Sequence, residues 1–292
     1  MMLGKWPQTE MTTKSTLFLT TTEIPTQFPE KLKNGSFYTV VQCKVPKILT
    51  VLEETVPSAL NRKLVDKLIL KEVPPSKEHT LARLPNNWLK NVRIKQFEVL
   101  NSVLSGDFIW YGNPFEEQVH SLVSFTASRC YLTGALTYDM AGTINTRGLD
   151  SLSRIEVIDF SYNHLTVVTG SAFLKPPTNL TTVILSYNSI EKIEGNAFQH
   201  SPLLKHVNLS HNLLESVSRA IFAAPARQLE HLDLSWNSLT VLPHDFFNNM
   251  PALRKVNLEK NFFYSMPKNP WAVIWTQLKY LDITGKNFIK WC

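Results

Sequence analysis

Asparagine recurs in a fixed frame through the second half of the chain, and this frame is the strongest constraint on what the chain can fold into. Five segments fit the pattern L-x-x-L-x-L-x-x-N-x-L, with other apolar residues at some of the leucine positions. They begin at Ile155, Leu180, Leu204, Leu229 and Leu253, so that successive starts lie 24 or 25 residues apart. A fixed period of this length predicts a solenoid, in which each repeat is one turn of the chain.

Each repeat contains one short strand. Its three apolar positions alternate with polar ones, as expected for a strand that buries one face, so Leu229, Leu232 and Leu234 should point inward. The asparagine follows the strand, where its amide can donate to and accept from backbone groups of the turn. We therefore predict a ladder of stacked, satisfied amides made by Asn163, Asn188, Asn212, Asn237 and Asn261.

A second set of apolar residues keeps the same period. An aromatic side chain comes eighteen residues after each start, at Phe173, Phe198, Phe222, Phe247 and Trp271. Another apolar side chain comes thirteen residues after each start, at Val168, Ile193, Val217, Leu242 and Met266. Both sets are predicted to fill the convex side of the core. A sixth strand from Leu278 keeps the apolar frame but has Lys286 at the asparagine position.

The frame continues upstream in a weaker form. Leu122, Phe125 and Ala127 fit the strand positions, with Cys130 in place of the asparagine. Earlier repeats could start near Val65 and Leu89. The interval from Leu122 to Ile155 is longer than the period, which indicates an insertion around 134–148.

The frame, with its aromatic nineteenth position, resembles the extracellular leucine-rich repeat class of Toll receptors, Slit and the small proteoglycans. The segment TGKNFIKWC (284–292) is similar to the start of the carboxy-terminal cap of that class, with Cys292 at its second cysteine and Lys290 replacing the first. LPNNWLKNVRIKQFEVLNSVLSGDF and the repeats after it are similar to secreted arthropod leucine-rich proteins, which include the non-catalytic subunit of the shrimp luciferase. The resemblance implies an α/β solenoid of horseshoe shape, with a parallel β-sheet on the concave face and short helices, 3₁₀ turns or loops on the convex face.

The composition and the repeat pattern, together with the caps that the resemblance implies, predict a division of the chain. We expect a disordered leader, or a wrongly assigned start, over 1–36 and a degenerate amino-terminal cap, with Cys43, over 37–64. Divergent repeats should follow over 65–154 and regular repeats over 155–283. The start of an incomplete carboxy-terminal cap should occupy 284–292.

Composition and motifs disfavour several other classes. The net charge of +6 is spread evenly and contains no run of Lys or Arg, so we expect no nucleic-acid partner. No apolar stretch approaches the roughly 20 residues of a transmembrane helix, and the run at 17–19 is shorter than the roughly 7–15 residues of a signal peptide. Without a phosphate loop, a G-x-S-x-G, an H-E-x-x-H or a C-x-x-C motif, we expect no enzyme, cofactor or metal.

Three columns of outward positions form the candidate binding surface. The first is predicted to be an aromatic row, because neighbouring strands lie about 4.8 Å apart; it holds Tyr162, Tyr187, His211, Trp236 and Lys260. The second includes Asp233, and the third holds His206, His231 and Lys255. For the individual aromatic residues packing is the favoured explanation, and the L-D-L consensus already explains the aspartate. For the aromatic row as a whole, a binding surface and packing are equally favoured. The two histidines could share a metal or respond to pH, but solvated surface residues are the simpler interpretation.

The sequence therefore predicts a non-enzymatic module, secreted or part of an ectodomain, that binds a macromolecular partner on its concave face. A protein ligand or partner subunit is expected, with glycans and lipids as further candidates. A stabilising accessory subunit of a secreted complex and a cytosolic scaffold are the alternatives. Sequons at Asn34, Asn179 and Asn208 make an N-glycosylated protein the favoured form.

The location can be tested by intact mass and terminal-peptide analysis of the native protein, before and after enzymatic deglycosylation. We expect a glycan at Asn34 or Asn179, which would establish a secreted protein. An unmodified mass equal to that of 1–292 would instead favour the intracellular scaffold.

Overall fold

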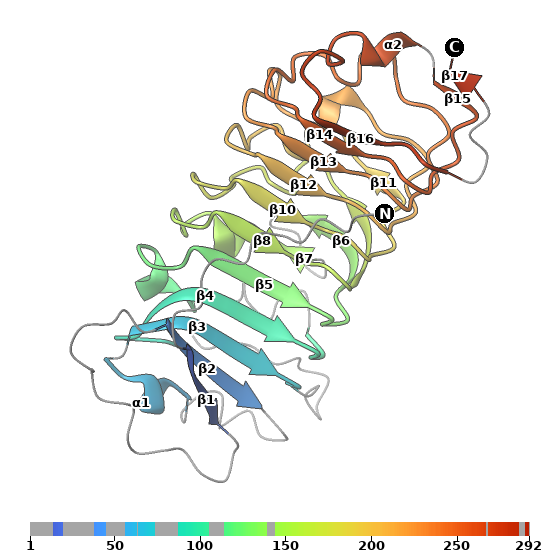
Figure 1. The fold of residues 1–292 in the computed structure, drawn as a ribbon. Helices are drawn as coiled ribbons and strands as arrows, with labels where there is room; N and C mark the ends of the chain where they lie inside the picture. Colours follow the sequence, from blue (N-terminus) through green and yellow to red (C-terminus); the bar gives the residue numbers. More distant parts are fainter. Residues whose placement is uncertain are drawn as a thin grey trace.

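The computed structural model shows a curved solenoid of stacked turns (Figure 1). The structure describes residues 14–19, 38–44, 56–62, 64–73, 87–104, 114–138, 144–266, 268–285 and 290–291. Statements about the fold below concern these ranges. Side chains are described for most of them, and for 14–19 and 290–291 only the backbone is considered.

One parallel sheet runs the length of the described solenoid. Its eleven strands are ordered β1-β2-β3-β4-β5-β8-β10-β12-β13-β14-β16, which is the order of the chain. The strands are β1 (Lys14–Leu19), β2 (Tyr38–Lys44), β3 (Leu64–Lys71), β4 (Arg93–Leu100), β5 (Ser124–Ser128), β8 (Val157–Asp159), β10 (Thr182–Ile184), β12 (His206–Asn208), β13 (His231–Asp233), β14 (Lys255–Asn257) and β16 (Tyr280–Asp282). Every neighbouring pair is parallel and in repeat register, so that Val207, Leu232 and Val256 are aligned across three strands.

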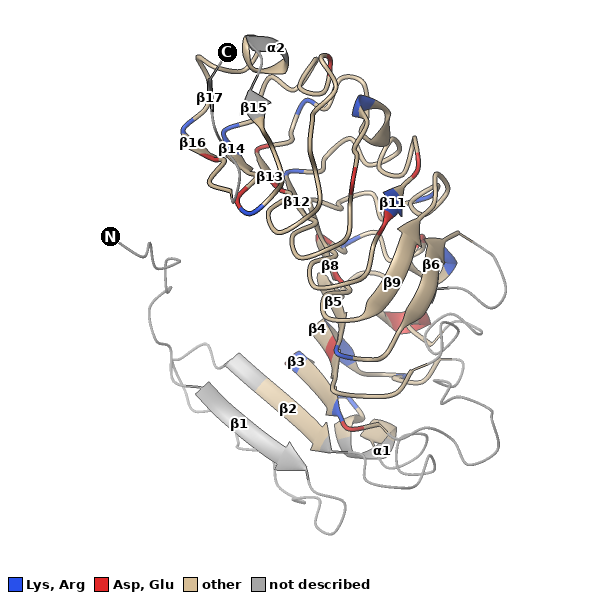
Figure 2. Cartoon of the chain, turned by 90° about the vertical axis from the view of Figure 1, so that its right-hand side faces the viewer, with Lys and Arg blue, Asp and Glu red and all other residues tan. Residues whose placement is uncertain are grey.

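The opposite side of the solenoid contains little helix. Short helices α1 (Val56–Leu60) and α2 (Lys268–Trp271) and 3₁₀ turns η2 (Glu116–Gln118), η3 (Arg147–Leu149) and η4 (Arg219–Ile221) occupy it together with loops. The main sheet lies on the inner side of the curve (Figure 2). The predicted horseshoe of parallel strands, with short helices, 3₁₀ turns and loops on its convex side, is therefore confirmed.

A second, smaller sheet was not predicted. Strands β6 (Thr133–Thr137), β7 (Ile144–Asn145), β9 (His164–Val168) and β11 (Lys192–Ile193) pair in the order β11-β9-β6-β7 on the side of the solenoid facing away from the main sheet (Figure 2). These strands form because the segment of each repeat that follows the turn is extended and lies beside the equivalent segment of the next repeat. The insertion expected around 134–148 supplies β7, which pairs with β6. A third pair joins β15 (Ser265–Met266) to β17 (Lys290–Trp291).

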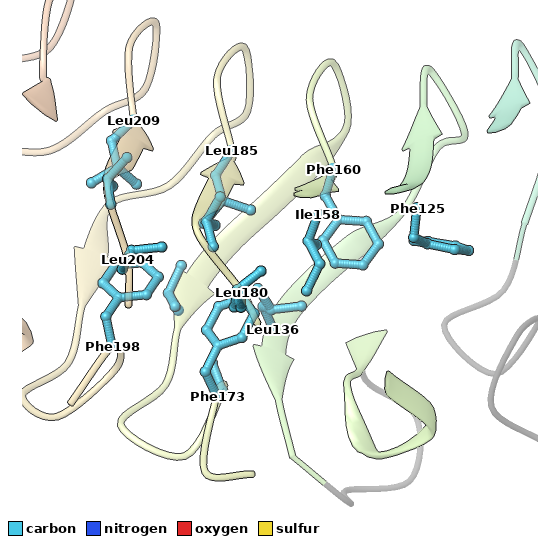
Figure 3. Close-up of a cluster of buried hydrophobic side chains, with 14 of the residues drawn as sticks. Phe125, Leu136, Ile158, Phe160, Phe173, Leu180, Leu185, Phe198, Leu204 and Leu209 are labelled. Carbon is cyan, nitrogen blue, oxygen red and sulfur yellow. The ribbon is translucent and has the colours of Figure 1, made fainter. Parts of the chain in front are cut away.

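The core is a continuous stack of apolar side chains between the two sides of the solenoid (Figure 3). The predicted aromatic column is present: the ring centroids of Phe173 and Phe198 lie 5.5 Å apart, and those of Phe198 and Phe222 lie 5.9 Å apart. Farther along the same column, the ring centroids of Phe247 and Trp271 lie 4.8 Å apart. Val168, Val217 and Leu242 are buried and Ile193 packs against the core, whereas the side chain of Met266 lies outside the described residues.

The asparagine ladder forms as predicted. The Nδ2 group of Asn212 donates to the carbonyl oxygens of Leu185 (3.0 Å) and Leu209 (3.0 Å), and its Oδ1 accepts from the backbone N–H of Ile190 at 3.0 Å. Each ladder amide thus bonds both to its own turn and to the turn before it. The same cross-repeat contacts are made by Asn163, Asn188, Asn237 and Asn261.

Two other side chains extend the ladder into the divergent half. The Cys130 thiol donates to the carbonyl oxygen of Val99 at 3.2 Å, and burial raises the pKa of this thiol to about 12, so it keeps its proton. The Ser102 hydroxyl accepts from the Val73 N–H at 3.1 Å. Smaller polar side chains, one accepting and one donating across the repeat, therefore replace asparagine where the repeat departs from its consensus. The equivalent Lys286 lies outside the described residues.

The amino-terminal part differs from the expected leader and cap. Within 1–36, residues Lys14–Leu19 form strand β1, which pairs along its length with β2. Within 37–64, β2 buries Val41 and Cys43, which align with the inward residues of β3, so the repeat frame starts earlier than we expected. An open parallel edge offers unpaired N–H and C=O groups, and a segment rich in threonine and apolar residues can add to it without the leucine consensus. Asn34 and Cys292 lie outside the described residues.

Replacing Asn212 by leucine should destabilise the protein by roughly 3 kcal/mol or more, because the change leaves several buried backbone groups without partners at about 1–3 kcal/mol each. The exposed Gln199, changed to leucine, is the matched control and should have little effect. Equilibrium urea unfolding of both variants measures the difference. Equal midpoints for Asn212→Leu and the wild type would show that the ladder bonds are dispensable.

Candidate functional site

The residue directly before each ladder position has a left-handed backbone conformation. The φ angles are 55° for Tyr162, 55° for Tyr187, 53° for His211, 54° for Trp236 and 56° for Lys260. Such angles are uncommon outside glycine, asparagine and aspartate. Here the turn after the strand imposes them, and hydrogen bonds between repeats hold them: the Tyr187 N–H, for example, donates to the Ser210 carbonyl oxygen at 3.0 Å. The side chains at this position are therefore aligned from repeat to repeat.

Their rings stack face to face. The centroids of Tyr162 and Tyr187 are 4.2 Å apart with an interplanar angle of 7°, and those of Tyr187 and His211 are 3.9 Å apart at 11°. His211 and Trp236 follow at 5.0 Å and 13°. The predicted aromatic row is thus one continuous stack.

A cation lies at each end of this stack. The guanidinium carbon of Arg129 is 4.4 Å from the Tyr162 centroid, and the Lys260 ammonium is 5.9 Å from the Trp236 centroid. We call these six residues (Arg129, Tyr162, Tyr187, His211, Trp236 and Lys260) the stacked column. Tyr162, Tyr187 and Trp236 remain 40%, 41% and 46% exposed, so their edges meet solvent while their faces cover one another. The column presents a rigid, amphipathic ridge.

His206 and His231 are neighbours on β12 and β13, as predicted, and their ring centroids lie 4.4 Å apart. Burial lowers the pKa of both, each is close to the Lys255 ammonium, and the charge of His206 further lowers the pKa of His231. Burial also lowers the pKa of His211 in the stacked column. Each of the three imidazoles is therefore biased towards its neutral form. Within the described ranges, no group of three or more His, Cys, Asp or Glu side chains is placed to hold a metal ion.

Asp233 makes a local structural contact. Its Oδ1 accepts from the Ser235 N–H at 2.9 Å and from the Ser235 hydroxyl at 2.6 Å. Asn208 makes the same pair of bonds to Ser210. The side chain at this strand position thus closes the turn that follows, which is the consensus explanation for the aspartate. Its carboxylate still lies on the concave face and contributes negative charge there.

A shallow groove follows the amino-terminal half of the stacked column. It is lined by Asn101, Arg129, Tyr131, Tyr162, Asn163, His164, Tyr187, Asn188, Ser189 and His211. Tyr131 is 61% exposed, and its ring centroid is 5.7 Å from that of His164. The lining thus combines side chains from the stacked column, from the ladder (Asn163 and Asn188) and from the position after the ladder (Tyr131, His164 and Ser189).

Sequence reasoning overlooked Arg129, Tyr131 and His164. The signal for Arg129 was available, since it directly precedes Cys130 as Tyr162 precedes Asn163. Tyr131 and His164 lie one position after the ladder, outside the columns we considered. Of the sequons, Asn179 is exposed in the turn before β10, whereas Asn208 is half-buried within β12. Their glycosylation stays a prediction.

The lowered pKa values of the three histidines predict that acid weakens the fold. Because the histidines bind protons more readily in the unfolded chain, protonation favours unfolding. The free energy of unfolding should therefore be highest above the histidine pKa of the unfolded chain, about 6.5, and should fall as the pH drops from there through the lower pKa values of the folded protein. We expect a lower melting temperature at pH 5 than at pH 7.5. The decrease should be smaller in a His206→Gln, His231→Gln double variant, and unchanged in His200→Gln, whose side chain is exposed on a loop. An identical decrease in the double variant would contradict this account.

Comparisons with known proteins agree with the solenoid fold and its repeats. Sequence models of the leucine-rich repeat family match residues 178–226 and 228–250. A search of curated protein sequences finds no match. Among solved structures, the TLR13–ssRNA13 complex has a TM-score of 0.59 at 17% identity, covering 87% of this chain and 36% of that one. The leucine-rich repeat domain of APL1B has a TM-score of 0.51 at 19% identity, covering 86% of this chain and 62% of that one.

In both cases this chain spans less than two thirds of the neighbour's length, and at these identities the likeness concerns the fold alone. In the part of the chain that the structure describes, no helix has the length and apolar character needed to cross a bilayer. The matched segments, the asparagine ladder and the parallel sheet lead to one conclusion: residues 178–226 and 228–250 are leucine-rich repeats, and the described chain has the solenoid fold of such repeats.

Proposed function

We propose that the chain is a binding module, secreted or part of an ectodomain, that holds a protein partner against its concave face along the stacked column. Leucine-rich repeat domains are generally protein–protein interaction modules. Repeat proteins of this kind use extended concave surfaces for recognition rather than catalysis. The observation that carries the proposal is the stacked column itself.

The stacked column has the properties of an interface anchor. Tyr and Trp are enriched among the residues that dominate binding energy, because they bury a large area with few rotatable bonds. Here Tyr162, Tyr187 and Trp236 are already held in place by stacking, so a partner would order few side chains on binding. The His206 and His231 pair, biased towards its neutral form, broadens the surface towards the middle of the sheet.

A protein partner fits this surface better than a nucleic acid. Single-stranded nucleic acids bind by stacking bases on aromatic faces along a basic groove. In the stacked column these faces cover one another, and Asp159, Asp233 and Glu259 add negative charge to the concave side. Charged residues of both signs are scattered along the described solenoid without a basic block (Figure 2). RNA, which one structural neighbour binds, is therefore the alternative to be tested.

Secretion is supported by the exposed position of the Asn179 sequon, where a glycan could be attached. Asn179 is exposed in the turn that leads into β10, at the opposite end of the strands from the stacked column. The hydroxyl of Thr181, the third residue of this sequon, donates to the Glu156 carbonyl oxygen at 3.2 Å. A glycan at Asn179 would leave the proposed binding surface open. The resemblance to secreted arthropod leucine-rich proteins points to the same compartment, and it also allows a role as the stabilising subunit of a secreted complex.

The proposed function can be tested by capturing partners on the immobilised native protein from the medium of cells that produce it. Trp236→Ala and Tyr187→Ala should each weaken a captured protein's affinity about thirtyfold, the effect expected of a central anchor worth roughly 2 kcal/mol. Trp275→Ala is the matched control, because this ring is 54% exposed in the segment before β16, at the other end of the strands. Partners that bind all three variants as they bind the wild type would disprove a role for the stacked column.

A further inference from the structure

We propose that the groove at the Arg129 end of the stacked column binds a carboxylate side chain presented by a peptide segment of the partner. This inference rests on the proposed function and names the chemistry that the partner must bring. It concerns a part of the surface, around Arg129 and Tyr131, that adjoins the predicted aromatic row without belonging to it.

The Arg129 side chain is preorganised to bind a carboxylate. Its side chain is exposed, and its guanidinium group lies over the Tyr162 ring at 4.4 Å from the centroid. A guanidinium group that contacts a ring through cation–π attraction keeps N–H donors for other partners. A guanidinium group offers pairs of N–H donors that match the two oxygens of a carboxylate. Because the side chain is already held against the ring, less conformational entropy is lost when it binds.

No described carboxylate already neutralises this cation. Strands β4 and β8, which flank the β5 strand before Arg129, each carry one acidic residue. Glu98 on β4 bonds to the Lys67 ammonium at 2.6 Å, and Asp159 on β8 accepts from the Ser161 N–H at 2.8 Å. The groove lining contains no Asp or Glu. Among the described residues, Arg129 therefore has an aromatic partner but no anionic one.

The remaining walls suit a peptide. Tyr131, His164 and Ser189 bring polar atoms to the lining, and Tyr162 and Tyr187 add aromatic rings. Aromatic edges carry partial positive charge and accept contact from carboxylate and carbonyl oxygens. The exposed Tyr131 ring offers apolar area for the methylene groups of an acidic side chain. The groove thus combines one fixed cation with neutral, adaptable surroundings.

A single carboxylate is favoured over a polyanion. Glu98 and Asp159 lie on the strands beside the groove, and the Glu98 charge adds to burial in raising the pKa of Asp159. A ligand with a negative charge on every unit, such as RNA or a sulfated glycan, would place some of its charges against these carboxylates. A peptide with one acidic residue among neutral or basic residues would avoid this repulsion.

The test is selection of a displayed library of random short peptides on the full chain, followed by fluorescence anisotropy with the enriched peptides. We expect the enriched peptides to share an Asp or Glu, and Arg129→Gln to weaken their binding about tenfold or more. Replacing that Asp or Glu by its amide should cost a similar factor, and the two losses should not add, since both remove the same contact. Arg154→Gln, at an exposed arginine in the loop before β8, is the matched control and should leave affinity unchanged.

Several outcomes would overturn the inference. Enriched peptides without a shared acidic residue, no enriched peptides, or equal losses for Arg129→Gln and Arg154→Gln would each do so. Stronger Arg129-dependent binding of a single-stranded RNA oligomer or a heparin fragment would show a polyanion site instead. Peptides that lose affinity in Trp236→Ala but not in Arg129→Gln would leave the proposed function standing and remove only the carboxylate site. Melting temperatures of the variants exclude unfolding as the cause of a loss.

Discussion

The structure depends on satisfying the backbone at one point of every repeat, where the chain leaves the strand and turns. A buried amide or carbonyl without a partner costs about 1–3 kcal/mol, and the turn would leave several of them in each repeat. Asn212 resolves this by bonding to its own turn and to the preceding one. Because the bonds cross between repeats, they also set the register of neighbouring strands and therefore the alignment of everything attached to them.

The surface follows from this alignment. The residue before the ladder takes a left-handed conformation in order to place the amide inward, and its side chain is then directed outward at the same point of each turn. The strand spacing of about 4.8 Å is close to the separation of stacked rings, so aromatic residues at this position stack without further adjustment. The 4.2 Å and 3.9 Å separations along Tyr162, Tyr187 and His211 are the result. Stacking also offsets part of the cost of the unusual backbone angle.

The regular half could be predicted because every repeat must bury the same apolar positions and pair the same backbone groups of the turn. The spacing of the residues therefore predicted the ladder, the inward leucines, the phenylalanine column and the aromatic row. The divergent half shows where this reasoning fails. Ser102 and Cys130 perform the ladder function with shorter polar side chains, and β2 buries Val41 and Cys43 without any leucine. The second sheet was missed because extended segments pair through their backbones and need no side-chain motif. The groove was missed because the outward columns considered did not include the position after the ladder, which supplies Tyr131, His164 and Ser189.

The fold requires an asparagine, or a substitute, at the ladder, but it requires only a left-handed conformation at the position before it. Glu72 and Asn101 satisfy that requirement in the earlier repeats without an aromatic ring. The rings of Tyr162, Tyr187 and Trp236 are therefore additional to what the turn needs. Their mutual stacking stabilises the solenoid, yet it also leaves a ridge of aromatic edges about half exposed. A purely structural stack would be expected to bury that area, and a surface kept both rigid and exposed is suited to contact with another molecule.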